Sequence, residues 1–318
     1  MIRRLQREEV ENFCTLAAVC GYVFGSPAWL DVVRPSIFGI FNKGGLLTGG
    51  FVAAESKLLG RRVLRTPLYY PSVGPFFLSD ASNPARLTEV RRRILTEMAE
   101  YLQSLGPIAV HLCLDRIHRD MLPFVWNGYK ATPGYTYLLD LKSSEDVLLS
   151  SMSAKRRSEL RKVDKDGIVV EETDDIECIE RIVALTFDRQ DKEYPSDLLH
   201  RLLSKLRQQD NWYAARSMVR GEVASVGFCL YSKDTAYYLF GGYNAQLKSA
   251  QAGPAVLWKL IRMAMERGLK TFDFEGSMVP AIERFYSDFG GTLTPYFRIS
   301  RAWYPLECAL KVKWRDSF

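Results

Sequence analysis

The chain has 318 residues, of which 47% are hydrophobic and 25% charged, with a formal net charge of +6. These values are typical of a globular protein of about two domains, and the mild charge permits an anionic ligand without indicating DNA binding. No run of about 18 apolar residues is present, so no membrane insertion is expected. The charged N-terminal residues lack the apolar run of a signal peptide, and the expected compartment is the cytoplasm.

Cysteine and histidine are too scattered to predict a metal centre. The six cysteines form no CxxC pair, and the three histidines lie far apart in the sequence. Cys113 and Cys229 lie inside apolar runs, where a free cysteine behaves as a small core residue. Neither a Cys/His metal site nor a structural disulfide is therefore expected.

The first part of the chain has the pattern of an α/β unit that ends at residue 142. Its predicted helices and strands cover residues 8–19, 36–42, 46–54, 83–105, 108–114 and 135–141. The segment 64–77 is rich in proline and aromatic residues, and Tyr69 and Tyr70 are candidates for lining a pocket. A packed irregular connection is an equally good interpretation of this segment.

A basic helix begins the second predicted domain, residues 143–318. Ser143 is its predicted N-cap. Its apolar residues recur at helical spacing: Leu148, Leu149, Met152, Leu160 and Val163. Arg156 falls within this stripe, so its side chain either extends to solvent or is held for a partner. The other cations of the helix are consistent with an ordinary solvated face.

The stretch 237–290 reads as strand, small-residue loop, helix and strand. The helix begins near Gly253 and ends at Gly268, and the second strand is predicted to place Asp273 and Glu275 on one side. Because a helix N-terminus presents free N–H groups and partial positive charge, the loop before it is a candidate site for a pyrophosphate or an oxyanion. An ordinary βαβ crossover explains the pattern equally well.

Two distant segments share a strand–turn–strand pattern. They are GIFNKGGLLTGGFVAA (39–54) and YAARSMVRGEVASVGFCL (213–230). Their separation is too long for a solenoid repeat and indicates a duplicated domain.

Four segments, in this order, resemble the FemAB-type family, which includes a BioF2-like acetyltransferase group. They are TPLYYPSVGP (66–75), NGYKATPGYTYLLDL (127–141), LLSSMSAKRRSELRKVDKDGIVV (148–170), and 237–290 continued through FYSDFGGTLTPYFRI (285–299). The resemblance implies an α/β (α+β) fold of two GNAT-like domains, each a mixed twisted sheet flanked by helices.

The resemblance also implies transfer of an acyl or aminoacyl group to an amine bound between the two domains, on a small molecule or a precursor peptide. The GNAT donor pyrophosphate site maps onto Gln251, Ala252, Gly253 and Ala255. Tyr286 stands where peptidoglycan-bridge members carry a Lys that handles the aminoacyl-tRNA end. We therefore expect an acyl-CoA donor, with aminoacyl-tRNA-dependent peptidyl transfer in cell-wall bridge formation as the alternative. A non-catalytic ligand-binding member of the fold is the second alternative.

Candidate substrate-binding residues follow from the same alignment. The family's basic motif aligns with Arg157 and Arg161, which lie four residues apart on one helix face and could grip one anion together. The further candidates are Arg156, Tyr69, Tyr70 and Tyr243.

The catalytic candidates are Asp273, Glu275 and Tyr286. A close carboxylate pair can raise the pKa of one member toward that of a general base, although Asp273 could instead only tie down a loop. Tyr286 could carry the proton, and backbone N–H groups near 241–244 could stabilise the oxyanion.

Overall fold

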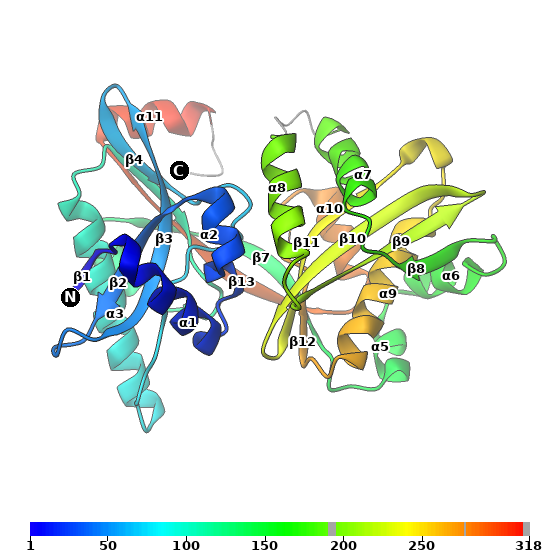
Figure 1. Ribbon diagram of the computed structural model, residues 1–318, viewed down its shortest axis with the longest axis horizontal. Coiled ribbons are helices and arrows are strands. Elements are labelled where there is room, and N and C mark those ends of the chain that lie inside the picture. The colour runs from blue at the N-terminus through cyan, green and yellow to red at the C-terminus, as the bar shows by residue number, and fades with distance from the viewer. Residues whose placement is uncertain (190–194, 277, 314–318) are drawn as a thin grey trace. The chain divides into compact units, whose positions relative to one another are not determined.

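The computed structural model describes residues 1–189, 195–276 and 278–313 (Figure 1). The chain divides into two compact units, Met1–Gly134 with Pro295–Phe318, and Tyr135–Thr294. The sequence-based boundary at residue 142 differs from this division, because it leaves 295–318 in the second domain. The structure places this segment in unit 1, where strand β13 (Thr292–Ala302) pairs antiparallel with β6 (Ala109–Cys113).

Unit 1 is a mixed sheet with helices around it. Its strands follow the order β1 (Ile2–Arg4), β2 (Ser36–Phe41), β3 (Leu47–Leu58), β4 (Arg61–Arg65), β6 and β13, and the short β5 (Phe76–Phe77) pairs with β3. β4 and β6 are parallel and are joined by α3 (Pro84–Ser104). The other helices are η1 (Arg7–Glu9), α1 (Val10–Cys20), η2 (Val23–Gly25), α2 (Pro27–Val33), α4 (Leu122–Trp126) and α11 (Tyr304–Lys313).

Unit 2 repeats this plan. Its strands follow the order β7 (Lys130–Asp140), β12 (Thr271–Asp273), β11 (Thr235–Tyr243), β10 (Glu222–Ser232), β9 (Trp212–Val219) and β8 (Val169–Glu172). β11 and β12 are parallel and are joined by α9 (Ala252–Glu266). The other helices are α5 (Glu145–Ser151), α6 (Ala154–Lys162), α7 (Ile176–Arg189), α8 (Ser196–Leu206), η3 (Ala245–Leu247) and α10 (Pro280–Ser287).

The predicted duplication is visible in the chain order of the elements. An antiparallel hairpin, a third strand, a helix and a parallel strand occur as β2-β3-β4-α3-β6 in unit 1 and as β9-β10-β11-α9-β12 in unit 2. The two units exchange the strand that completes each sheet. β7 follows α4 of unit 1 but pairs with β12 of unit 2, and β13 follows α10 of unit 2 but pairs with β6 of unit 1. The two predicted mixed sheets with flanking helices are confirmed, and this exchange explains why unit 1 is discontinuous in sequence.

Helices cover both faces of the unit 2 sheet. Gly227 of β10 faces α9, because a Cβ there would meet the Leu260 side chain at 2.5 Å. Gly242 of β11 faces α7, because a Cβ there would meet the Ile182 carbonyl oxygen at 2.3 Å. Gly242 pairs with Val226, the neighbour of Gly227, and successive residues of a strand point to opposite faces. The α9 face holds an apolar core built around the buried residues of that helix.

The basic segment after residue 142 forms two helices, although a single helix was predicted. Ser144, rather than Ser143, caps α5 by accepting a hydrogen bond from the Val147 N–H. Ser153 caps α6 by accepting one from the Arg156 N–H, and its own N–H donates to the Asp288 carbonyl oxygen at 3.0 Å. Apolar spacing alone does not detect this break, because the stripe continues across both helices.

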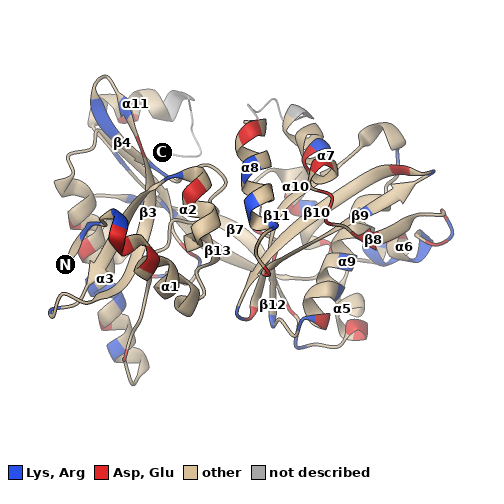
Figure 2. Ribbon diagram, in the orientation of Figure 1, with Lys and Arg blue, Asp and Glu red and all other residues tan. Residues whose placement is uncertain are grey.

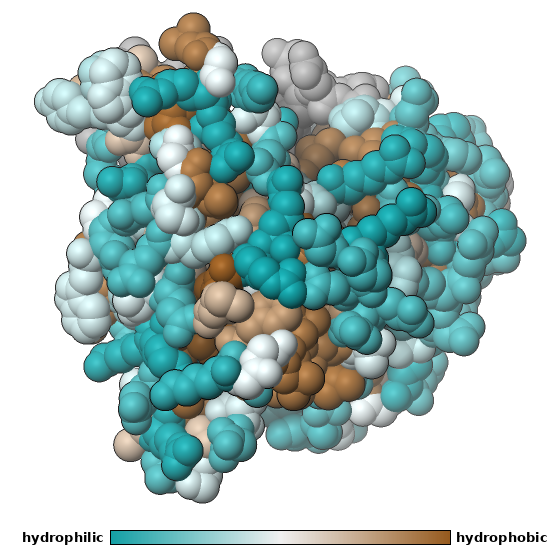
Figure 3. All heavy atoms as spheres, turned by 60° about the vertical axis from the view of Figure 1, so that its left-hand side comes forward, coloured by the Kyte–Doolittle hydropathy of each residue, from teal (hydrophilic) through white to brown (hydrophobic). Residues whose placement is uncertain are grey.

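The molecular surface mixes polar and apolar side chains (Figure 3). Hydrophilic residues cover most of the face shown, and apolar residues gather in patches between them. Folded proteins expose apolar atoms over roughly half of their surface, so such patches are ordinary on their own. In the part of the chain that the structure describes, no helix combines the length and apolar character needed to cross a membrane.

Candidate functional site

Strands β11 and β12 separate in the middle of the unit 2 sheet. Their parallel pairing ends at Tyr237 and Asp273. β11 continues beside β10 to Tyr243, whereas the chain after β12 turns away, with Glu275 in the left-handed region at φ +56°. Within the described residues, no strand pairs with this edge of β11 beyond Tyr237. The predicted strand through Glu275 therefore ends at Asp273, and the two carboxylates do not share a strand face.

Asp273 holds the loop that follows β12. Its side chain is 2% exposed, and Oδ1 accepts hydrogen bonds from the Thr136 hydroxyl at 2.7 Å and from the Glu275 N–H at 2.9 Å. The next residue, Phe274, donates its N–H to the Tyr137 carbonyl oxygen at 3.1 Å. These bonds fix the unusual backbone of Glu275, which matches the loop-tying role considered for Asp273.

A β-bulge lies in β11 at the point of separation. Phe240 pairs with Phe228 and Tyr238 with Cys229, which leaves Leu239 as the extra residue. A bulge bends its strand and redirects the neighbouring side chains, and such irregularities are enriched beside active sites.

Two tyrosines meet beside this bulge. The ring of Tyr238 lies edge to face against Tyr286 of α10, with 6.1 Å between the ring centroids. The Tyr238 hydroxyl lies directly over Gly241, where a Cβ would come within 1.7 Å of the hydroxyl oxygen. The Tyr238 side chain can therefore pack here only because Gly241 has no Cβ.

Both tyrosine hydroxyls are held in the protonated form. Burial raises the pKa of Tyr286 above its ordinary value, and the negative charge of Glu275 raises this pKa further. Burial also raises the pKa of Tyr238 well above its ordinary value, followed by the effect of Tyr286. At neutral pH these groups can donate a hydrogen bond or a proton, but they cannot act as phenolate bases.

Arg156 anchors α10, the helix that carries Tyr286. Its guanidinium lies 4.5 Å from the ring centroids of both Phe285 and Phe289, and it donates to Glu159 at 2.7 Å and to the Phe285 carbonyl oxygen at 3.0 Å. A second carboxylate, Asp288, lies at 3.5 Å. Burial lowers the pKa of Arg156, and both carboxylates oppose this effect.

The apolar spacing placed Arg156 correctly, because the residue is 1% exposed. Its guanidinium is occupied by groups of the protein itself. These contacts hold its guanidinium against α10 and the residues that follow it.

The predicted donor-binding residues form the first turn of α9. The helix begins at Ala252, two residues before Pro254, the predicted first helical residue, and Pro254 still lies in the first turn, where a missing N–H costs no helical bond. Gln251 is the N-cap residue, and its side chain makes no capping hydrogen bond. Gly253 lies near Phe285, since a Cβ there would approach that ring at 3.8 Å. The α9 N-terminus and α10 therefore lie side by side.

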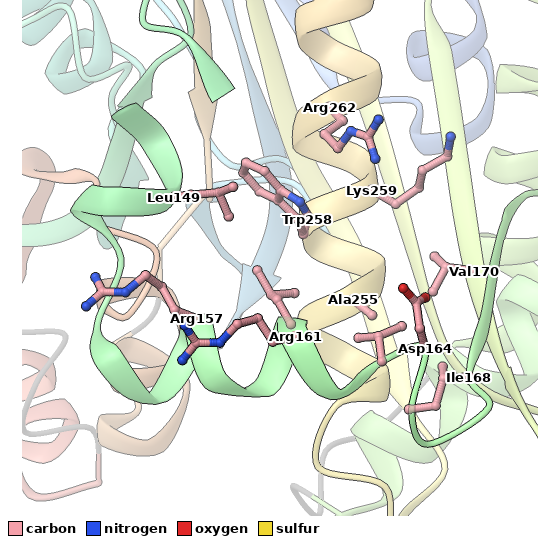
Figure 4. A pocket seen from close by; sticks show the side chains of 12 residues that line it. Leu149, Arg157, Arg161, Asp164, Ile168, Val170, Ala255, Trp258, Lys259 and Arg262 are labelled. Carbon is pink, nitrogen blue, oxygen red and sulfur yellow. The ribbon is translucent and has the colours of Figure 1, made fainter. Parts of the chain in front are cut away.

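Apart from the place where β11 and β12 separate, a hollow lies between α6 and α9 (Figure 4). Its volume is about 590 Å³. The residues that line it come from α5, α6, α9, β8 and the turn before β8: Leu149, Arg157, Leu160, Arg161, Val163, Asp164, Ile168, Val170, Ala255, Trp258, Lys259 and Arg262. Three predicted site residues, Arg157, Arg161 and Ala255, thus meet in one pocket. We call this hollow the α6–α9 pocket.

The α6–α9 pocket is basic, with four cations and one carboxylate in its lining. Figure 2 shows Lys and Arg on both of its helices. Arg157 donates to the Ser150 and Met152 carbonyl oxygens and so secures the end of α5. Sequence reasoning missed Trp258, Lys259 and Arg262. Their signal was helical spacing, because residues 255, 258, 259 and 262 recur on one face of α9.

The remaining predicted residues lie apart from these two places. Tyr70 is 6% exposed in the core of unit 1, and its ring lies 5.6 Å from that of Trp29, which favours the packed-connection interpretation. Tyr69 lies in the same turn of unit 1, with φ +64°. Tyr243, at the end of β11, is 47% exposed. Among the described residues, no cluster of three His, Cys, Asp or Glu side chains could hold a metal ion.

Sequence comparison gives a family match for most of unit 2. Residues 150–285 match the family model described as acetyltransferase (GNAT) domain. The chain has the tandem GNAT fold. No curated protein sequence matches it.

Solved structures extend the tandem GNAT comparison to nearly the whole chain. FemX aligns with a TM-score of 0.67 at 13% identity, over 98% of this chain and 100% of FemX. The C-terminal domain of a putative lysylphosphatidylglycerol synthetase from Agrobacterium fabrum aligns with a TM-score of 0.59 at 12% identity, over 95% of each chain. A tandem GNAT protein from the clavulanic acid biosynthesis pathway aligns with a TM-score of 0.53 at 10% identity, over 95% of this chain and 98% of that one. The predicted resemblance to FemAB-type proteins is confirmed.

Proposed function

We propose that this protein is an N-acyltransferase that moves an acyl group from an acyl-CoA-like thioester to an amine. The observation that carries the proposal is the separation of β11 from β12 beside two protonated tyrosines and the N-terminus of α9. The acetyltransferase (GNAT) match over 150–285 supports it, because that range contains the separating strands and α9.

The donor would bind at the first turn of α9 and along the edge of β11. Backbone N–H groups at a helix N-terminus carry partial positive charge and suit a pyrophosphate. Gln251, Ala252 and Gly253 supply this turn without a competing side-chain cap. The edge of β11 beyond Tyr237 would present backbone N–H groups to the thioester carbonyl oxygen, where negative charge develops during acyl transfer.

The chemistry requires two proton movements. The amine nitrogen attacks the carbonyl carbon and loses a proton, and the C–S bond breaks to leave a thiolate that gains one. Tyr286, protonated at neutral pH, would donate to the thiolate. Glu275, whose charge raises the Tyr286 pKa, would accept the proton of the amine, and Asp273 would hold the Glu275 backbone in place. Exchange with water then restores both groups.

Calorimetry with acetyl-CoA, followed by a mass-shift screen of amine acceptors, tests this proposal. We expect acetyl-CoA to bind and a subset of amines to gain the mass of an acetyl group. Absence of binding by acetyl-CoA and by longer acyl-CoAs would rule out the thioester donor.

Aminoacyl-tRNA is the second candidate donor. Its support is the alignment with FemX and the lysylphosphatidylglycerol synthetase domain over nearly the full chain, together with the basic α6–α9 pocket. This candidate predicts transfer of a labelled amino acid to a precursor peptide or another amine, and loss of that transfer after ribonuclease treatment.

A further inference from the structure

We propose that the α6–α9 pocket binds a phosphorylated nucleoside at a site separate from the donor site. The proposal concerns a second ligand and does not depend on the transfer reaction, because binding is measurable without donor or acceptor. Its elements are a group of cations, an indole side chain and one carboxylate without a partner, all lining a hollow of about 590 Å³. This volume falls within the range of small-molecule pockets, roughly 300–1,000 Å³.

The cations are available to an anion. Among the described residues, neither Arg161 nor Lys259 has a carboxylate within ion-pair distance, and Arg262 reaches Glu145 only at 3.5 Å. Arg157 stands beside them with its guanidinium held by carbonyl groups of α5. Two or more cations around one hollow suit a phosphate, because charge-assisted hydrogen bonds to its oxygens are the stronger kind.

The indole and the apolar wall indicate that the ligand is more than a phosphate. Trp258 projects from α9 toward Leu149 (Figure 4), and Leu160 of α6 also lines the hollow. An aromatic side chain beside a basic surface suits a nucleobase, whose flat face stacks on such rings. A free inorganic anion would leave this apolar surface unused.

Asp164 favours a nucleotide over a plain polyanion as the ligand. Its carboxylate lines the pocket and has no hydrogen-bond or ion-pair partner in the described part of the chain. A carboxylate repels phosphate but accepts hydrogen bonds from ribose hydroxyls and from base amino groups. The lining thus offers cations for a phosphate and one acceptor for a ribose hydroxyl or a base amino group.

The pocket also differs in position from the proposed donor site. Of its α9 residues, Ala255 is shared with the predicted donor turn, whereas Trp258, Lys259 and Arg262 lie beyond that turn, and the remainder come from α5, α6, β8 and the turn before β8. A ligand held by these cations and by α6 therefore uses side chains that residues 251–253 do not supply.

Calorimetry with ADP and with inorganic pyrophosphate on the full chain tests the proposal. We expect ADP to bind more tightly than pyrophosphate, and R161S/K259S to raise the Kd for ADP by about tenfold or more. Trp258→Ala should remove most of the preference for ADP over pyrophosphate. Lys155→Ser is the matched control, because it removes a cation from the same helix outside the pocket and should leave the Kd unchanged.

Four results would overturn the proposal. ADP could fail to bind at millimolar concentration in low salt, or could bind R161S/K259S as tightly as the parent protein. The same variant could lose acetyl-CoA affinity in parallel, which would make this pocket part of the donor site. Binding of phosphatidylglycerol vesicles that depends on Arg161 and Lys259 and resists ADP would assign the pocket to a lipid surface. Thermal unfolding of each variant confirms that it is folded.

Discussion

Arg156→Ala tests whether one buried cation holds the helix that carries Tyr286. The change removes two charge-assisted hydrogen bonds and the contact of the guanidinium with two phenylalanine rings. Removing one partner of a buried ion pair costs about 3–5 kcal/mol. Glu159 and Asp288 keep 14% and 18% of their side-chain surface exposed and can rehydrate, so we expect a loss near the lower end, about 3 kcal/mol.

The assay is denaturant unfolding monitored in parallel with acyl transfer. Lys155→Ala is the control, because Lys155 is 70% exposed and lies 3.9 Å from the same Glu159. Exposed pairs of this kind contribute less than about 1 kcal/mol. Arg156→Ala should therefore destabilise unit 2 much more than Lys155→Ala does, and should lower activity through α10. Equal losses in the two variants would refute the anchoring role.

Four further predictions concern the place where β11 and β12 separate. Tyr286→Phe should lower kcat by about 10²-fold or more with little change in the KM for the donor, because the hydroxyl is assigned to the thiolate leaving group; an equal change in KM would indicate a binding role instead. The raised Tyr286 pKa favours the protonated folded state, so this contribution to stability is complete below the ordinary tyrosine pKa of about 10 and is lost as the pH rises from there through the folded pKa; a parent protein whose rate falls between pH 7 and 9 through tyrosine ionisation would contradict this assignment. Gly241→Ala should destabilise by about 1–3 kcal/mol through collision with the Tyr238 hydroxyl, and much less in a Tyr238→Phe background, as a double-mutant cycle of unfolding free energies would show. Asp273→Ala should release the loop that holds Glu275 and lower activity, whereas Asp273→Asn keeps the Oδ1 acceptor and should retain more of both stability and rate; identical behaviour of the two variants would argue against the hydrogen-bonding role.

Local sequence signals predicted the helices and hairpins whose ends are set by capping and turn residues. The helix predicted from residue 83 forms as α3, with Asn83 accepting the Arg86 N–H at 2.9 Å, and Gly268 ends α9 with φ +73° as predicted. The two hairpins of the internal repeat also form as predicted. These features depend on neighbouring residues, so spacing and turn chemistry are sufficient to find them.

The exchange of β7 and β13 was not predictable in the same way. Each strand has an ordinary alternating pattern, and nothing in that pattern records which sheet receives it. The left-handed backbone of Glu275 is another such case, because it depends on hydrogen bonds that Asp273 makes with Thr136 and with the chain itself. Sequence patterns therefore named the tyrosine, the carboxylates and the helix N-terminus of the proposed site, but not the geometry that relates them.

Acetyl-CoA titration of three proteins, the parent, Gly253→Ala and Gly253→Asp, tests the acyltransferase account most directly. A Cβ at Gly253 would meet no atom closer than 3.8 Å, so the alanine variant should fold and bind as the parent does. An aspartate in the first turn of α9 places a negative charge beside the proposed pyrophosphate site. The account predicts a Kd between about 1 µM and 1 mM for the parent and for Gly253→Ala, and at least about tenfold weaker binding for Gly253→Asp. Equal binding by all three proteins would contradict donor binding at α9, and absence of binding by the parent would contradict the acyl-CoA donor itself.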